Sequence, residues 1–269
     1  TQEYFDDLEP AEANEYIKSK AYENLQPLVS VPYTNEIISD KEEEPKLKCE
    51  VNKHAQLPKK WKEQFPPSSM ELIFENEPLA CSFNSVVTLA RDYLKDMNIN
   101  VGDIKKRLAA KYEELSKTYS TELIRALTIG GKKKIASLFK NGKASIVDIV
   151  LSDAYYLSNI DIVIISQNFR IPLILFSSTT LPENNSSFLT AYTEKGAKHY
   201  FLKVPGVQID GPMKYKLVAS ESGGLIKSSS LRGDIATFMK DTRTYLNIEQ
   251  LLTEIGGKPS KTKKKLTIK

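Results

Sequence analysis

The stretch that decides the fold is Tyr156-Leu-Ser-Asn-Ile-Asp-Ile-Val-Ile-Ile-Ser-Gln-Asn-Phe-Arg-Ile-Pro-Leu-Ile-Leu-Phe176. Its apolar residues over 159–169 predict a buried helix, because a helix that is apolar on most sides has no face for water. Residues 170–176 follow directly and predict an apolar strand. Pro172 has no N–H to donate, so we expect it at an edge or at the start of that strand. The chain changes here from helical to extended patterns.

The pattern before this stretch is mostly helical, and the pattern after it is mostly extended. Alternation predicts an early strand over 70–75, and helical spacing follows over 82–97, 101–119, 121–127, 133–139 and 145–151. Downstream, a turn-rich loop over 179–187 precedes strands over 188–193, 199–204 and 215–220, and helices over 231–240 and 248–255. Helices that precede a mostly antiparallel sheet indicate the α+β class.

Composition divides the chain into three parts. Residues 1–67 are acidic and then mixed, which predicts an extended or partly disordered arm. The Pro66-Pro67-Ser68-Ser69 segment marks a boundary, and residues 68–255 hold the globular domain. Residues 256–269 form a basic tail. Trp61, the one tryptophan, lies in the arm, where it either anchors the arm to the domain or to a partner, or simply packs against the core.

Bulk composition excludes several classes of protein. The 269 residues are 41% hydrophobic, and 38 Lys and Arg against 34 Asp and Glu give a net charge of +4, too mild to indicate nucleic-acid binding by itself. Two cysteines build no disulfide framework, which favours an intracellular, cytoplasmic location. We see no membrane span and no signal-peptide pattern. Because residue 1 is Thr, the sequence is consistent with a fragment.

One pair of residues offers catalytic chemistry. Cys81 begins an apolar run with helical spacing, and His199, one of two histidines, lies in an alternating segment typical of a strand. A thiol at a helix N-terminus that meets an imidazole becomes a reactive thiolate. Taken alone, however, such a cysteine is more often a small buried hydrophobe.

These residues together resemble the ovarian-tumour (OTU) class of cysteine peptidases over about residues 72–206. The resemblance rests on Cys81-Ser-Phe at a helix start, the helix and strand of residues 156–176, and the His199-Tyr200 pair. The chain also resembles the OTU-like domains of some giant DNA viruses, whose proteins are Lys-rich with short basic tails, which implies a host-cytoplasmic or virion location. The resemblance implies a papain-like or OTU-like fold with helices packed on a mostly antiparallel sheet. It also implies Cys81 and His199 as catalytic residues and ubiquitin or ubiquitin-like conjugates as substrates.

Three positions depart from the family pattern. Pro78 and Leu79 stand where the family has Asp and Gly, and Phe201 stands where many members have an Asp or Asn that orients the histidine; Asp210 is a substitute suggested only by its proximity in sequence. Two readings therefore stay open. The first is a thiol-dependent deubiquitinase, and the second is an inactive OTU-like domain that serves as a protein-interaction or scaffold module of a large viral protein.

Other motifs carry weaker signals. Cys49 and His54 have poor zinc spacing, so we expect no metal and no cofactor. The segment Gly130-Gly-Lys-Lys-Lys134 lacks the spacing of a phosphate-binding loop, and we interpret it as a solvated basic turn. The Lys-rich segments leave weak, nonspecific nucleic-acid binding as a third hypothesis.

Overall fold

The computed structural model of the protein describes residues 53–74, 78–183, 186–206, 213–228 and 247–256. The secondary-structure elements of these residues are β1 (Lys53–Gln56), α3 (Lys59–Lys62), β2 (Ser69–Ile73), α4 (Pro78–Leu94), α5 (Val101–Ile129), α6 (Lys133–Lys140), α7 (Ile146–Leu151), α8 (Asn159–Asn168), β3 (Leu173–Leu181), β4 (Ser186–Tyr192), β5 (Tyr200–Lys203), β6 (Lys216–Ser220) and α10 (Ile248–Ile255).

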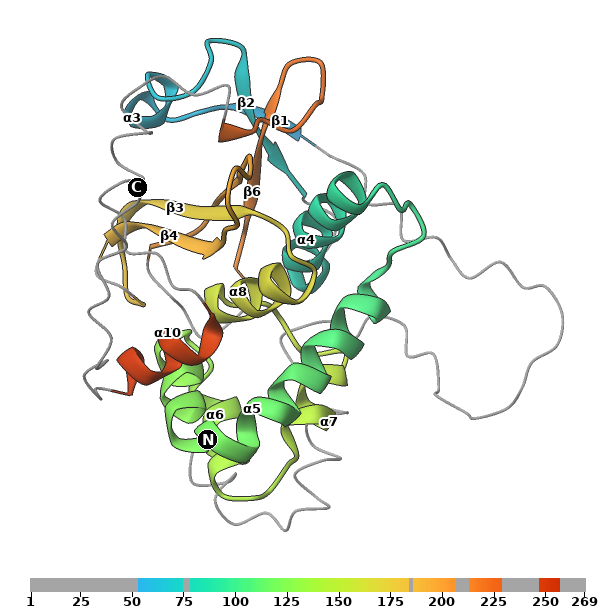
Figure 1. Ribbon diagram of the computed structural model, residues 1–269, viewed down its shortest axis with the longest axis vertical. Coiled ribbons are helices and arrows are strands. Elements are labelled where there is room, and N and C mark those ends of the chain that lie inside the picture. Colours follow the sequence, from blue (N-terminus) through green and yellow to red (C-terminus); the bar gives the residue numbers. More distant parts are fainter. Residues whose placement is uncertain (1–52, 75–77, 184–185, 207–212, 229–246, 257–269) are drawn as a thin grey trace, which may run out of the picture.

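The strands form one six-stranded sheet in the order β1-β2-β6-β5-β3-β4. Strands β3 and β5 run parallel, with Leu173 opposite Tyr200, and the other neighbouring strands run antiparallel. Helices α4 and α8 lie next to the sheet, and α5, α6, α7 and α10 form the part of the molecule farther from it (Figure 1). The predicted α+β class and the mostly antiparallel sheet are therefore confirmed.

Both faces of the sheet are covered. Successive side chains of a strand point to opposite faces. On β3, Leu173 and Leu175 belong to the large core beneath the helices, whereas Ile174 and Phe176 belong to a second cluster on the other face. The second cluster includes Trp61, whose ring meets that of Phe176 edge-to-face at a centroid distance of 4.9 Å.

The prediction of an extended or partly disordered arm over residues 1–67 is wrong for residues 53–65. Residues 53–56 pair with β2 as strand β1, and Leu57, Trp61 and Phe65 cover the second cluster. These three apolar residues are four apart, so a short helical segment brings them to one side. The packing reading of Trp61 is thereby confirmed, because the indole is 3% exposed. The rest of the arm lies outside the described residues.

Most predicted elements are present, with shifted ends. Helix α4 begins at Pro78, a residue suited to a first helical turn because it needs no N–H there. Helix α5 joins two predicted helices, and its kink at Tyr119 falls at the predicted break. Pro172 lies directly before β3, as expected of a strand start. The predicted loop over 179–187 is shorter, since β3 continues to Leu181 and β4 begins at Ser186. The predicted helix over 231–240 and the basic tail beyond residue 256 lie outside the described residues.

Candidate functional site

Cys81 lies in the first turn of α4, as predicted. It is the fourth residue of the helix, where backbone N–H groups have no partner within the helix. Its side chain lies outside the described part of the structure. The next residue, Ser82, is fully buried, and its hydroxyl accepts a hydrogen bond of 3.3 Å from the backbone N–H of Leu157. This bond holds the first turn of α4 against the segment that precedes α8.

His199 lies directly before β5 and is 7% exposed. Its Nε2 is 2.8 Å from the hydroxyl of Thr193, and its backbone N–H donates to the hydroxyl of Ser228 at 2.9 Å. Within the described residues Nδ1 has no partner. Burial lowers the pKa of the His199 imidazole. The ring is therefore held neutral near physiological pH, because burial disfavours its charged form.

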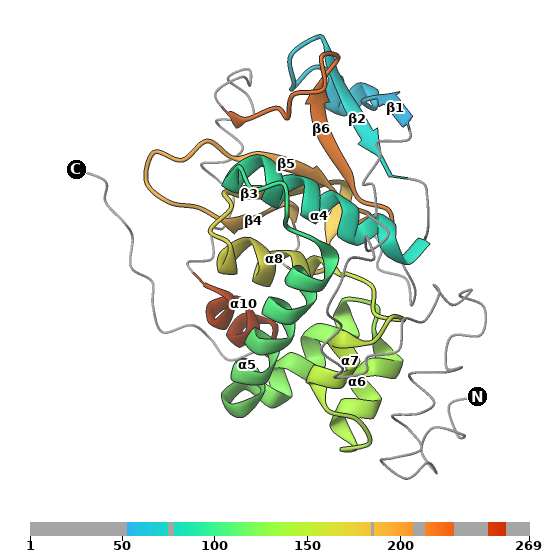
Figure 2. The same cartoon turned by 90° about the vertical axis from the view of Figure 1, so that its right-hand side faces the viewer.

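Contacts at the two ends of α4 fix its direction relative to β5. Near the helix C-terminus, Asp92 accepts a 2.6 Å hydrogen bond from the hydroxyl of Tyr200, the residue after His199. Near the helix N-terminus, Leu157 donates its N–H to the Ser82 hydroxyl, and its carbonyl accepts a 3.1 Å hydrogen bond from the hydroxyl of Tyr215. Tyr215 precedes β6, which starts opposite the end of β5. Helix α4 thus runs antiparallel to β5, along which it lies in Figure 2.

This direction places the two predicted catalytic residues at opposite ends of α4. Cys81 precedes Asp92 by 11 residues, which corresponds to about 16 Å along the helix axis. His199 lies beside the Asp92 end, because its neighbour Tyr200 bonds to that residue. The described backbone therefore does not bring Cys81 and His199 together.

The position expected to orient the histidine is part of the core. Phe201 is 1% exposed, and its ring meets Phe65 edge-to-face at a centroid distance of 5.1 Å in the second cluster. It lies on the face of the sheet opposite Tyr200. The suggested substitute, Asp210, lies outside the described residues. Within the part of the chain that the structure describes, the imidazole has one ring partner, the Thr193 hydroxyl.

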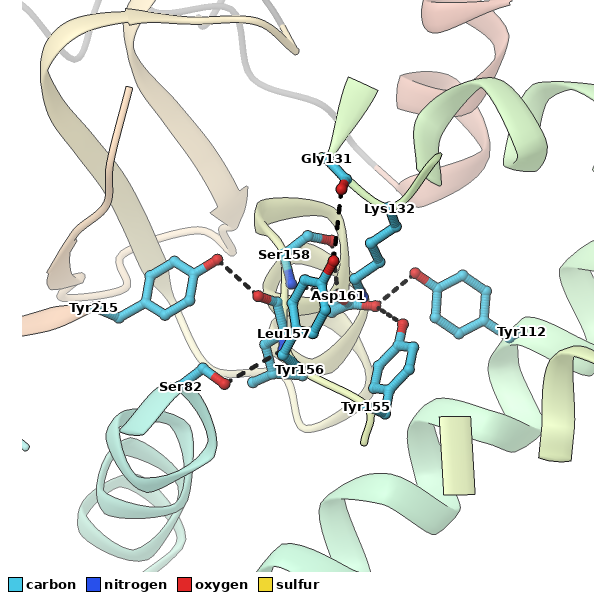
Figure 3. A network of polar contacts seen from close by, with 10 residues as sticks. All are labelled: Ser82, Tyr112, Gly131, Lys132, Tyr155, Tyr156, Leu157, Ser158, Asp161 and Tyr215. Carbon is cyan, nitrogen blue, oxygen red and sulfur yellow. Dashed lines mark hydrogen bonds and ion pairs between the residues drawn. The ribbon is translucent and has the colours of Figure 1, made fainter. Parts of the chain in front are cut away.

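The strongest polar constellation of the described residues is a buried ion pair that sequence reasoning missed. Lys132 and Asp161 are both fully buried, and their Nζ and Oδ2 atoms are 2.5 Å apart (Figure 3). The other oxygen of Asp161 accepts hydrogen bonds of 2.6 Å from the hydroxyls of Tyr112 and Tyr155. Ser158 adds donors from its backbone N–H and its hydroxyl to Oδ2. The carboxylate therefore has a donor for each of its acceptor sites.

The buried surroundings shift the pKa values of both partners of this ion pair. Burial lowers the pKa of Lys132 to about 8, against the attraction of Asp161. Burial alone raises the pKa of Asp161, but Lys132 and the tyrosine hydroxyls together bring it below its usual value. The ammonium also lies 3.8 Å from the centre of the Tyr155 ring, a cation–π distance. The network ties α5 and α8 to the start of α6, because Tyr112 lies in α5, Asp161 in α8, and Lys132 directly before α6.

The prediction of a solvated basic turn over 130–134 is wrong at its centre. Gly131 has φ 79°, which turns the chain so that Lys132 enters the core while Lys133 and Lys134 stay exposed. The sequence signal was Asp161, a charged residue inside an apolar helix, because a buried carboxylate needs a partner. Tyr155 and its neighbour Tyr156 are each 1% exposed and pack in the core.

The described residues contain no group of three or more His, Cys, Asp or Glu side chains placed to share a metal ion. Cys49 lies outside them, and His54 belongs to β1. None of the described helices is long and apolar enough to cross a membrane.

Comparison with known proteins found no matching family model, no matching curated protein and no matching solved structure.

Proposed function

We propose that this chain is a protein-interaction or scaffold module with an OTU-like arrangement, and that it binds ubiquitin-type proteins without hydrolysing them. The observation that carries the proposal is the direction of α4, which leaves Cys81 and His199 at opposite ends of the helix. The expected partner follows from the family resemblance of the sequence.

Thiol catalysis requires a shorter distance. A general base must be within hydrogen-bond reach of the thiol, about 3 Å or a little more in a free enzyme. The separation along α4 is about 16 Å. In addition, the Thr193 hydroxyl is hydrogen-bonded to Nε2 of His199, and burial lowers the pKa of the imidazole, which makes it a weaker base. A distant and weakly basic imidazole neither deprotonates the thiol nor lowers its pKa.

The alternative is the peptidase. It is favoured by the position of Cys81 in the first turn of α4, where the helix N-terminus lowers the pKa of a thiol. In that reading the thiolate attacks the carbonyl of an isopeptide bond, and an imidazole protonates the leaving amine.

A ubiquitin probe with a C-terminal electrophile separates the two functions. The full chain is incubated with the probe, in parallel with Cys81→Ala, His199→Ala and the control Cys49→Ala, and its folding is followed by circular dichroism. A binding module gives no covalent adduct with any of the folded proteins, while unmodified ubiquitin binds wild type and Cys81→Ala equally well. An adduct that disappears in both Cys81→Ala and His199→Ala establishes the peptidase instead. Absence of both adduct and binding contradicts both readings.

A further inference from the structure

An open hollow lies at the kink of α5, next to the end of α10. It is lined by six residues of α5, between Lys117 and Arg125, and by Gly256 at the C-terminal cap of α10. Helix α5 leaves helical backbone angles at Tyr119, so the lining residues lie on both sides of the kink. The volume of this α5 hollow is about 370 Å³, which is within the range of small-molecule sites.

The packing of α10 on α5 sets the wall of the α5 hollow. The two helices lie against each other in both views (Figures 1 and 2). A Cβ atom at Gly256 would lie 2.7 Å from Cγ of Glu122, closer than real side chains pack. Because residue 256 is a glycine, α10 can end directly against Glu122, which is 9% exposed. The α5 hollow is therefore built by two elements that the fold holds together.

The side chains that α5 contributes are suited to an anion. Lys117, Thr121 and Arg125 are four residues apart, which places them in one row along the helix with the threonine between the two cations. Thr118 and Ser120 add two more hydroxyls to the lining. Within the part of the chain that the structure describes, none of these five side chains makes a hydrogen bond or an ion pair. Two cations and three hydroxyls therefore have donors available for a ligand.

We propose that the α5 hollow binds the phosphate group of a small phosphorylated molecule. A phosphate monoester carries nearly two negative charges at neutral pH and offers strong acceptor oxygens. The guanidinium of Arg125 presents a planar fork of N–H donors that matches two phosphate oxygens, and Lys117 adds a compact positive charge. The hydroxyl of Thr121, between them in the row, donates to a further oxygen.

The charges around the α5 hollow favour one small anion over a nucleic acid. Lys117 and Arg125 contribute two formal positive charges, and Glu122 contributes one negative charge, so the lining side chains carry a net charge of +1. A nucleic acid is bound by a groove with cations for several successive phosphates and by aromatic side chains that stack on bases. The lining residues include no aromatic side chain and only these two cations. The inference does not depend on the interaction function proposed above.

The test is an NMR titration of the ¹⁵N-labelled full chain at about pH 7.5, where the phosphate is mostly dianionic. The probes are glycerol 3-phosphate, inorganic phosphate and a short thymidine oligonucleotide, with sodium chloride at the same ionic strength as the reference. We expect glycerol 3-phosphate to shift the backbone N–H signals of residues 117–125. Shifts with inorganic phosphate alone overturn the assignment to a phosphorylated molecule, and tighter binding of the oligonucleotide at these residues assigns the hollow to nucleic acid instead.

Substitutions locate the site. Lys117→Gln and Arg125→Gln should each weaken the binding of glycerol 3-phosphate about tenfold, because each removes a charge-assisted hydrogen bond. Lys106→Gln is the matched control, since Lys106 is an exposed lysine of the same helix outside the lining, and it should leave the affinity unchanged. Glu122→Gln should tighten binding, because it removes a negative charge beside the anion.

The proposal is overturned if sodium chloride produces the same shifts, or if Lys106→Gln weakens binding as much as Lys117→Gln and Arg125→Gln. Circular dichroism confirms that each variant is folded. Lys117 and Arg125 are exposed, so their removal leaves the core intact. If Glu122→Gln does not fold, the two cation variants and the control carry the test.

Discussion

The buried Lys132–Asp161 pair supports a quantitative prediction about stability. Lys132→Met keeps the length of the side chain but leaves the Asp161 carboxylate buried without its cation. Asp161→Asn leaves the ammonium unpaired and turns an amide N–H₂ toward hydroxyl donors. Removing one partner of a buried ion pair destabilises a protein by about 3–5 kcal/mol. Removing both charges together leaves no uncompensated charge, so the double variant loses less stability than the two single variants combined.

The contacts place the two single variants within that range. In Lys132→Met the carboxylate keeps its bonds from Tyr112, Tyr155 and Ser158, so we expect a loss of about 3 kcal/mol. In Asp161→Asn both tyrosine hydroxyls lose a charged acceptor, so we expect about 5 kcal/mol. The double variant also loses these hydroxyl bonds and falls near the Asp161→Asn value. The coupling free energy of the pair is then about 3 kcal/mol.

Urea unfolding of the full chain, followed by circular dichroism, measures these free energies for wild type, both single variants and the double variant. Lys133→Met is the matched control, because Lys133 is the exposed neighbour of Lys132 and its loss should change stability by no more than about 0.5 kcal/mol. If the two single losses add in the double variant to within about 0.5 kcal/mol, the side chains do not interact and the reasoning is refuted.

Three further predictions concern the second cluster and His199. Trp61→Ala should lower the free energy of unfolding by about 3–5 kcal/mol in urea titrations, because the indole is buried in the second cluster. An unchanged free energy of unfolding contradicts this. Burial lowers the pKa of His199 in the folded protein, so the unfolded chain binds a proton at His199 more readily than the folded protein does. The free energy of unfolding therefore falls as the pH decreases below about 6.5. The melting-temperature difference between wild type and His199→Gln should therefore change over that range, and parallel curves would exclude it. Phe201→Asp should unfold the protein in circular dichroism rather than create a peptidase, and a folded variant that reacts with the ubiquitin probe would show that Phe201 does not need its core position.

Local patterns were sufficient for much of the fold. The run over 156–176 allowed little besides a buried helix followed by a buried strand, and α8 and β3 lie there. The segment over 53–65 was missed, because Leu57, Trp61 and Phe65 lie within Lys-, Pro- and Glu-rich sequence. Their spacing of four residues was the available signal. The polar composition of residues 1–67 as a whole hid this apolar spacing.

The candidate site depended on properties that local patterns do not encode. Residue type and spacing identified Cys81 at a helix start, but its distance from His199 depends on the direction of α4 relative to β5. That direction comes from long-range contacts such as the bond between Asp92 and Tyr200, which are 108 residues apart. Lys132 was misassigned for a similar reason. Its burial depends on a carboxylate 29 residues away, whereas its neighbours in sequence are exposed lysines.

The direction of α4 also predicts how a reactive Cys81 would behave. His199 lies beside Asp92, at the other end of the helix from Cys81. Any ubiquitin-probe adduct at Cys81 should therefore survive His199→Ala and disappear in Cys81→Ala. Such a result would replace the non-catalytic proposal by a thiol whose reactivity comes from its place at the start of α4. Loss of the adduct in a folded His199→Ala variant would instead mean that α4 does not run antiparallel to β5.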